Sequence, residues 1–82
     1  MNFEFTYSNN FKKHYKKLSA IEKKQVTGKL ILLSKDPAHP SLRTKRIQGT
    51  DRLFESSANM DVRIIWYYDA YVKHETKIFA IQ

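Results

Sequence analysis

The sequence contains no cysteine, and only two glycines and two prolines occur among its 82 residues. Without cysteine no disulfide framework can form, so a domain this small depends on its core and on any partner for stability. The scarcity of glycine and proline argues against a linker or a disordered tail. No apolar run approaches the roughly 20 residues that a membrane-spanning helix needs. These absences predict a single domain, residues 1–82, in the cytoplasm and without a membrane partner.

Acidic side chains are also few. The chain has 15 Lys and Arg against 8 Asp and Glu, which gives a net charge of +7. The excess is concentrated between Phe5 and Arg46, where eleven basic residues stand against Glu22 and Asp36 alone. Such a surface attracts polyanions, most obviously nucleic acid or the ribosome. Charge alone leaves two alternatives open, a merely solubilising face and an acidic protein partner.

Metal and cofactor chemistry has little support in the sequence. The three histidines, His14, His39 and His74, are far apart and lack the spacing of metal ligands. There is no glycine-rich phosphate-binding loop. We therefore expect no metal site and no cofactor.

Hydrophobic periodicity predicts a strand and two helices in the first half of the chain. Apolar residues alternate with polar ones over residues 3–7, as in a half-buried strand. Ser8 is placed to cap a helix with an apolar face of Phe11, Tyr15 and Leu18. Ser19 and Glu22 have the spacing of a capping box at the start of a second helix. The predicted apolar stripe of that helix consists of Ile21, Val26, Leu30 and Leu33.

The second half of the chain reads as strands. Asp36-Pro37 ends the second helix, and strands are predicted over residues 53–58, 62–68 and 71–81, of which residues 62–68 are rich in β-branched and aromatic residues. Turns are expected at residues 59–61 and 69–70. The predicted fold class is α+β: an N-terminal strand, an antiparallel helical hairpin, and an antiparallel sheet of about three strands, with both helices on one face of the sheet.

One group of residues has the chemistry for RNA cleavage without metal. A basic cluster precedes the strand that contains Glu55, and Arg63 lies in the strand after that; the cluster consists of Arg43, Lys45 and Arg46. Cleavage needs a base for the ribose 2′-OH and cations for the phosphate. We assign these roles to Glu55 as base, Arg63 as phosphate clamp, and Lys45 as charge stabiliser or proton donor.

Each of these assignments has a simpler alternative. Glu55 and Arg63 can meet across the hairpin as an ion pair without any catalytic role. The aromatic residues near the end of the chain can stack on bases, but most of them are expected to belong to the core; they are Trp66, Tyr67, Tyr68 and Tyr71. The expected RNA-binding residues outside the catalytic set are Arg43, Arg46, Lys12, Lys13 and Lys16.

Two segments resemble the RelE/ParE superfamily of toxins from type II toxin–antitoxin systems, and the RelE-like branch in particular. They are HPSLRTKRIQG (residues 39–49) and LFESSANMDVRIIWYY (residues 53–68), preceded by the lysine-rich helical hairpin. The resemblance implies a microbial ribonuclease fold and a metal-independent enzyme that cuts mRNA in the ribosomal A site and so inhibits translation. It also implies a cognate antitoxin, with operator DNA bound only through the toxin–antitoxin complex.

The resemblance also bears on single residues. Arg63 matches the family's functional arginine, and Arg43, Lys45 and Arg46 match its basic stretch. Ser57 stands where many members carry a basic residue, and the chain lacks the segment with a terminal His, Tyr or Lys that usually follows the last strand. Two alternatives therefore stay open: a ParE-like inhibitor of DNA gyrase, and a catalytically weakened toxin that mainly binds its antitoxin.

Overall fold

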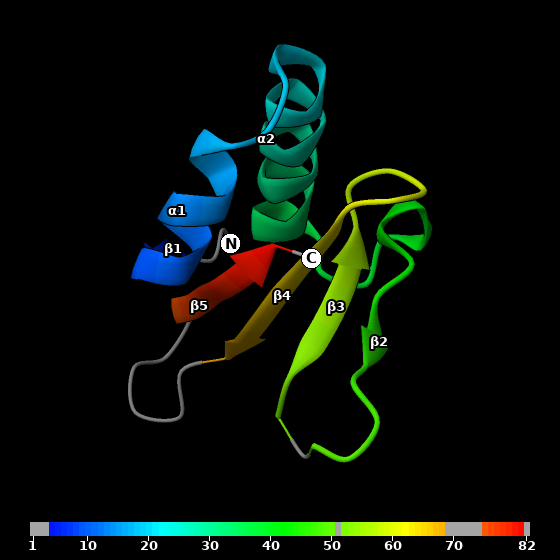
Figure 1. Cartoon of the computed structure of the whole chain (residues 1–82). Coiled ribbons are helices and arrows are strands. Elements are labelled where there is room, and N and C mark those ends of the chain that lie inside the picture. Colours follow the sequence, from blue (N-terminus) through cyan, green and yellow to red (C-terminus); the bar gives the residue numbers. More distant parts are fainter. Residues whose placement is uncertain (1–3, 51, 69–74, 82) are drawn as a thin grey trace.

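The computed structural model describes residues 4–50, 52–68 and 75–81, and in the last strand only the side chain of Ile78. The predicted order of elements is confirmed (Figure 1). The elements are β1 (Glu4–Tyr7), α1 (Asn9–Lys16), α2 (Ala20–Lys35), the 3₁₀ turn η1 (Pro40–Leu42), β2 (Lys45–Arg46), β3 (Phe54–Ser57), β4 (Arg63–Tyr68) and β5 (Glu75–Ile81). The predicted turn at residues 69–70 lies outside the described residues.

Both helices begin at the serines that the sequence indicates. The Ser8 hydroxyl accepts a hydrogen bond from the Phe11 N–H at 3.0 Å. At α2 the Ser19 hydroxyl accepts from the Glu22 N–H at 3.1 Å, and the Ser19 N–H donates to Glu22 Oε1 at 2.9 Å. This capping box gives hydrogen-bond partners to two backbone N–H groups and fixes the start of α2. The helix ends with Asp36 as its C-cap, before Pro37.

The strands form one five-stranded mixed sheet in the order β1-β5-β4-β3-β2. The strands β3, β4 and β5 form the predicted antiparallel meander, with Ser57 opposite Arg63 and Glu55 opposite Ile65. The N-terminal strand does not stand apart from this sheet. It pairs in parallel with β5, with Tyr7 opposite Ile78, and forms one edge. The short strand β2 forms the other edge.

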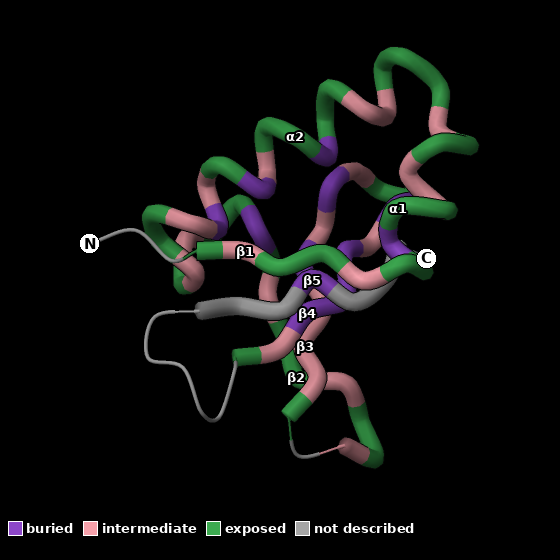
Figure 2. Tube along the Cα trace, turned by 90° about the vertical axis from the view of Figure 1, so that its left-hand side faces the viewer, coloured by how far each residue is buried: buried purple, intermediate pink, exposed green. Residues whose placement is uncertain are grey.

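The core lies between the sheet and the two helices, which cover the same face of the sheet (Figure 2). Val26, Leu30 and Leu33 of α2 are buried, as predicted. The inclusion of Ile21 in this stripe was wrong, since its side chain is 71% exposed. Ile21 precedes Val26 by five residues, and at about 100° per residue it is turned well away from the core. No helix in the described parts of the chain is long and apolar enough to cross a membrane.

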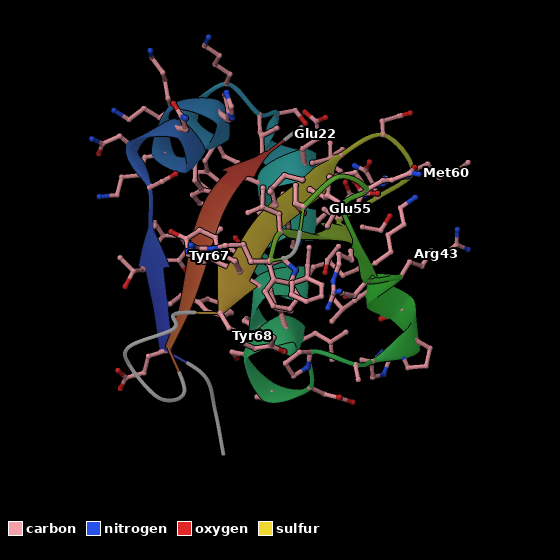
Figure 3. All side chains as sticks on the ribbon, turned by 90° about the horizontal axis from the view of Figure 1, so that it is seen from below. Glu22, Arg43, Glu55, Met60, Tyr67 and Tyr68 are labelled. Carbon is pink, nitrogen blue, oxygen red and sulfur yellow. The ribbon has the colours of Figure 1, made fainter. Side chains whose placement is uncertain are left out.

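The other face of the sheet carries the polar candidates. Ile64, Trp66 and Ile78 are buried in the core beneath the helices. Because side chains alternate along a strand, Arg63 on β4 and Glu55 on β3 lie on the opposite face. Figure 3 shows the sheet with α2 behind it, with Glu55, Arg43 and Tyr67 spread across this face and its margin.

Candidate functional site

The loop after α2 holds Arg43 in an unusual backbone conformation. Arg43 has φ 49° and ψ 43°, the left-handed region that side-chain-bearing residues rarely adopt. Two local hydrogen bonds tighten this loop: His39 Nδ1 accepts from the Ser41 N–H at 3.1 Å, and the Arg43 N–H donates to the Pro40 carbonyl at 3.1 Å. A left-handed residue of this kind costs about 1–3 kcal/mol, so the surrounding structure must hold it in place.

A chain of hydrogen bonds ties the same loop to the core. Trp66 Nε1–H donates to the buried Ser56 hydroxyl at 2.9 Å, and Ser56 Oγ lies 2.7 Å from Thr44 Oγ1. Thr44 donates its one hydroxyl proton to the Pro37 carbonyl at 3.3 Å, so Ser56 must donate to Thr44. The direction of the chain is therefore fixed from the indole to the loop carbonyl. It connects β4, β3 and the segment that precedes β2.

Arg63 is anchored on the β3–β4 turn. Its Nη1 donates to the Asn59 carbonyl at 2.6 Å and approaches the Val62 carbonyl at 3.4 Å. The Asn59 side chain stabilises this turn by accepting from the N–H groups of Asp61 and Val62 at 2.7 and 2.8 Å. Within the described part of the chain, these bonds use only one nitrogen of the guanidinium. The remaining N–H groups of Arg63 are available to an anion.

Three cations from three elements line one pocket of about 310 Å³: Lys29 of α2, Arg43 of the loop and Arg63 of β4. Ser57 and Asn59 also line it, and none of its lining residues is a carboxylate. Lys29 is held there by a hydrogen bond from its Nζ to the Ser41 carbonyl at 3.2 Å. We call this the cationic pocket. The positive charge of its three basic side chains suits a phosphate.

Sequence reasoning missed Lys29, although a signal was present. Lys29 follows Val26 by three residues and precedes Leu33 by four, so it lies at the margin of the buried stripe of α2. A lysine in that position must extend along the helix toward a neighbouring element, which here is the loop before β2.

The ion pair between Glu55 and Arg63, which was the simpler alternative to a catalytic role, is not formed. Arg63 lies opposite Ser57. Glu55 forms its ion pair with Lys45, its cross-strand neighbour on β2, with Lys45 Nζ and Glu55 Oε1 3.3 Å apart. Glu55 and Arg63 are diagonal neighbours on one face, which side chains bridge less readily than a directly opposed pair. The Lys45 side chain is 73% exposed, so its ion pair is worth at most about 1 kcal/mol and can be exchanged for a bound anion.

The predicted RNA-binding residues do not form one surface. Arg43 lines the cationic pocket, whereas the guanidinium of Arg46 lies 5.7 Å from the centre of the Phe54 ring. Lys12, Lys13 and Lys16 are exposed on α1, which packs near β5 and not near β2 (Figure 1). The structure therefore brings together Arg43 and Arg63 but not the lysines of α1.

Lys12 and Lys16 instead border an apolar groove of about 570 Å³ between β1, α1 and α2. Its walls are largely aromatic and aliphatic; they include Phe5, Tyr7, Phe11, Tyr15, Leu30 and Ile31. Ile31 is 53% exposed. Burial raises the pKa of Tyr7 above its ordinary value, with a smaller contribution from the neighbouring Tyr15. We call this surface the helical groove.

The prediction that most of the aromatic residues near the end of the chain belong to the core was wrong, because only Trp66 is buried among the three that the structure describes. Tyr67 alternates onto the opposite face of the sheet, and Tyr68 lies at the end of β4. Trp66 is buried against Phe54, with ring centres 4.9 Å apart. The guanidinium of Arg52 lies over the ring of Tyr67, with Cζ 4.2 Å from the ring centre. Tyr68 is exposed, whereas Tyr71 lies outside the described residues. Among the residues that the structure describes, no group of three or more His, Asp and Glu could hold a metal ion.

The sequence matches no protein-family model and no curated protein. Solved structures match over the whole chain. The archaeal RelE–RelB complex from Pyrococcus horikoshii gives a TM-score of 0.80 at 15% identity, covering 100% of this chain and 94% of that one. The RelBE2 toxin–antitoxin complex from Mycobacterium tuberculosis gives 0.81 at 13% identity, with coverages of 100% and 98%.

A third structure, the YoeB dimer from Staphylococcus aureus, gives a TM-score of 0.81 at 14% identity and covers 100% of this chain and 97% of that one. The chain therefore has the α+β fold of the RelE and YoeB toxins, and the resemblance noted in the sequence is confirmed at the level of the fold. At these identities the likeness establishes the fold alone.

Proposed function

We propose that this chain is the toxin of a type II toxin–antitoxin pair and acts as a metal-independent, ribosome-dependent mRNA endoribonuclease. The observation that carries the proposal is the cationic pocket, in which Lys29, Arg43 and Arg63 converge without a carboxylate in the lining. The whole-length likeness to RelE and YoeB toxin structures supports it. The net charge of +7 favours approach to ribosomal RNA and to mRNA in the A site.

The proposed chemistry is a transfer of the phosphoryl group to the ribose 2′-oxygen. Arg63, with Nη1 fixed to the turn carbonyls, offers its other N–H groups to a phosphate oxygen. Arg43 and Lys29 add positive charge where negative charge accumulates on the phosphorane. A bound RNA strand displaces Lys45 from Glu55, because the ion pair is weak and exposed. Glu55 then takes the 2′-OH proton, and Lys45 protonates the leaving oxygen.

The experiment that tests this function is primer extension on translated mRNA after induction of the protein. Wild type should produce cuts in the reading frame and arrest growth. Arg63→Ala should abolish both while retaining the fold. Arg46→Ala is the matched control, because it removes an arginine outside the cationic pocket and should leave the cuts in place. Undiminished cutting by Arg63→Ala would refute the assignment.

One observation favours a second candidate, a weakened toxin that mainly binds its antitoxin. Glu55 is paired with Lys45 and does not line the cationic pocket. If that pair holds in the presence of RNA, the site lacks a base. Expression without any partner would then be harmless, and wild type would give no cuts by primer extension.

The antitoxin is the proposed protein partner, and operator DNA is bound only through the complex with it. The structural neighbours include toxins crystallised with their antitoxins. The helical groove is the surface we assign to it. Lys12 and Lys16 on its border favour an amphipathic segment with acidic flanks, and the apolar walls favour its hydrophobic face.

Two isoleucines of α2 give a matched test of this surface. Ile31 lines the helical groove, whereas Ile21 does not, and both are exposed. In co-purification with the protein encoded next to the toxin gene, Ile31→Lys should lose the partner and Ile21→Lys should retain it. Equal retention by both variants would move the antitoxin to another surface.

A further inference from the structure

A second pocket lies beside the cationic one. It has a volume of about 580 Å³ and is bounded by the end of α2, the loop after it, and the strands β3 and β4. Phe54, Trp66 and Tyr68 form its aromatic wall, and His39 and Arg43 belong to its loop wall. Arg43 also lines the cationic pocket, so the two pockets share this residue.

The three rings of the aromatic wall pack against one another. Tyr68 meets Trp66 and Phe54 edge-on, with ring centres 5.1 and 5.9 Å apart. Trp66 is 1% exposed, Phe54 is half-buried and Tyr68 is 42% exposed, so Tyr68 is the most exposed of the three rings. Partial burial raises the pKa of its phenol. A half-exposed ring in a concave setting is the kind of surface on which unpaired bases stack.

The loop wall supplies polar groups at the same pocket. His39 Nδ1 accepts a hydrogen bond from the Ser41 N–H, so the neutral imidazole carries its proton on Nε2 and can donate a hydrogen bond there. Arg43 supplies a guanidinium, and the residue that follows it, Thr44, is tied to β3 and β4 by the Trp66–Ser56–Thr44–Pro37 hydrogen-bond chain. The pocket thus combines a stacking surface with groups that can bond to the edge of a base.

We infer that this pocket is a nucleobase subsite. It receives the base of a nucleotide next to the phosphate in the cationic pocket, with Arg43 between the two. The inference rests on the proposed RNA-binding function. A nucleobase fits better than an apolar protein side chain, because the pocket adjoins the cationic pocket and its lining includes the polar groups of Asp36, His39 and Arg43, which can bond to the donors and acceptors on the edge of a base. Tyr68 is its principal stacking residue.

The single tryptophan of the chain makes the pocket observable. Trp66 lines it, and its indole N–H gives one distinct signal in a ¹H–¹⁵N correlation spectrum. Adenosine, which carries a base but no phosphate, should move this signal in a saturable way. Tyr68→Leu should weaken adenosine binding by about tenfold, since a stacked base contributes of that order. Tyr68→Phe keeps the ring and should bind as wild type does.

Tyr7→Leu is the matched control, because Tyr7 is a similarly exposed tyrosine that lines the helical groove. It should leave adenosine binding unchanged. Arg63→Ala should also leave it unchanged, since adenosine has no phosphate for that residue to hold. The adenosine titration therefore tests the pocket, and primer extension with Arg63→Ala tests the proposed nuclease separately.

Three results would overturn the inference. They are an indole signal that does not respond to adenosine, an equal response in Tyr68→Leu and wild type, and a response to leucine amide without one to adenosine. The last result would assign the pocket to a side chain of a protein partner.

Discussion

Replacing Ser56 by alanine removes the centre of the hydrogen-bond chain beneath the Arg43 loop. Ser56 is fully buried, accepts from Trp66 Nε1–H at 2.9 Å and donates to Thr44 Oγ1 at 2.7 Å. The alanine variant leaves the indole N–H of the buried Trp66 without a partner among the described residues. Thr44 also loses the proton that Ser56 gives it.

The expected cost follows from these contacts. An unsatisfied buried donor costs about 1–3 kcal/mol, and one further net hydrogen bond contributes about 1 kcal/mol. The free energy of unfolding should therefore fall by about 2–4 kcal/mol in Ser56→Ala. For a domain of this size that is a large part of the usual total of about 5–15 kcal/mol.

The assay is urea unfolding followed by far-ultraviolet circular dichroism, since the substitution itself alters the emission of Trp66. Ser34→Ala is the control, because the exposed Ser34 hydroxyl only donates to the Ile31 carbonyl. It should change the unfolding free energy by no more than about 0.5 kcal/mol. A loss below about 1 kcal/mol in Ser56→Ala, or one equal to that of Ser34→Ala, would refute the reasoning.

Three further outcomes follow from local structure. Ser19→Ala removes the capping box of α2 and should lower the unfolding free energy by about 1 kcal/mol in the same urea assay. Gly28→Ala should raise it by about 0.5–1 kcal/mol, because a Cβ at this helical position meets nothing within 4 Å; Gly49→Ala, at φ +86°, should lower it instead. Tyr7 and Tyr68 have pKa values raised above 10.0, so the folded state keeps these protons longer than the unfolded state does. Stability should therefore fall as pH rises above about 10, and less so when both are phenylalanine, as measured by unfolding at a series of alkaline pH values.

The sequence predicted most of the local structure because the signals for it are local. Ser8 and Ser19 mark helix starts through bonds to residues three positions away, and Pro37 marks the end of α2 through its own geometry. The alternation in β3 and β4 placed Glu55 and Arg63 on one face of the sheet, as the strand register confirms.

The features that the sequence did not predict depend on long-range geometry. The parallel pairing of β1 with β5 places Glu4 opposite Glu75. Nothing in the alternation of either strand specifies a partner so far along the chain. The same holds for the partner of Glu55, because the pairing of β2 with β3 brings Lys45 opposite it. Lys29 enters the site only through the packing of α2 against the loop before β2.

The most direct test of the central claim, that the cationic pocket holds the scissile phosphate, is the single-turnover rate of mRNA cleavage on purified ribosomes with a defined codon in the A site. Wild type should cleave the message. Arg63→Ala should slow cleavage by at least about a hundredfold, the cost of losing one charge-stabilising donor, while Arg46→Ala stays within about threefold of wild type. Equal rates for Arg63→Ala and Arg46→Ala would contradict the claim.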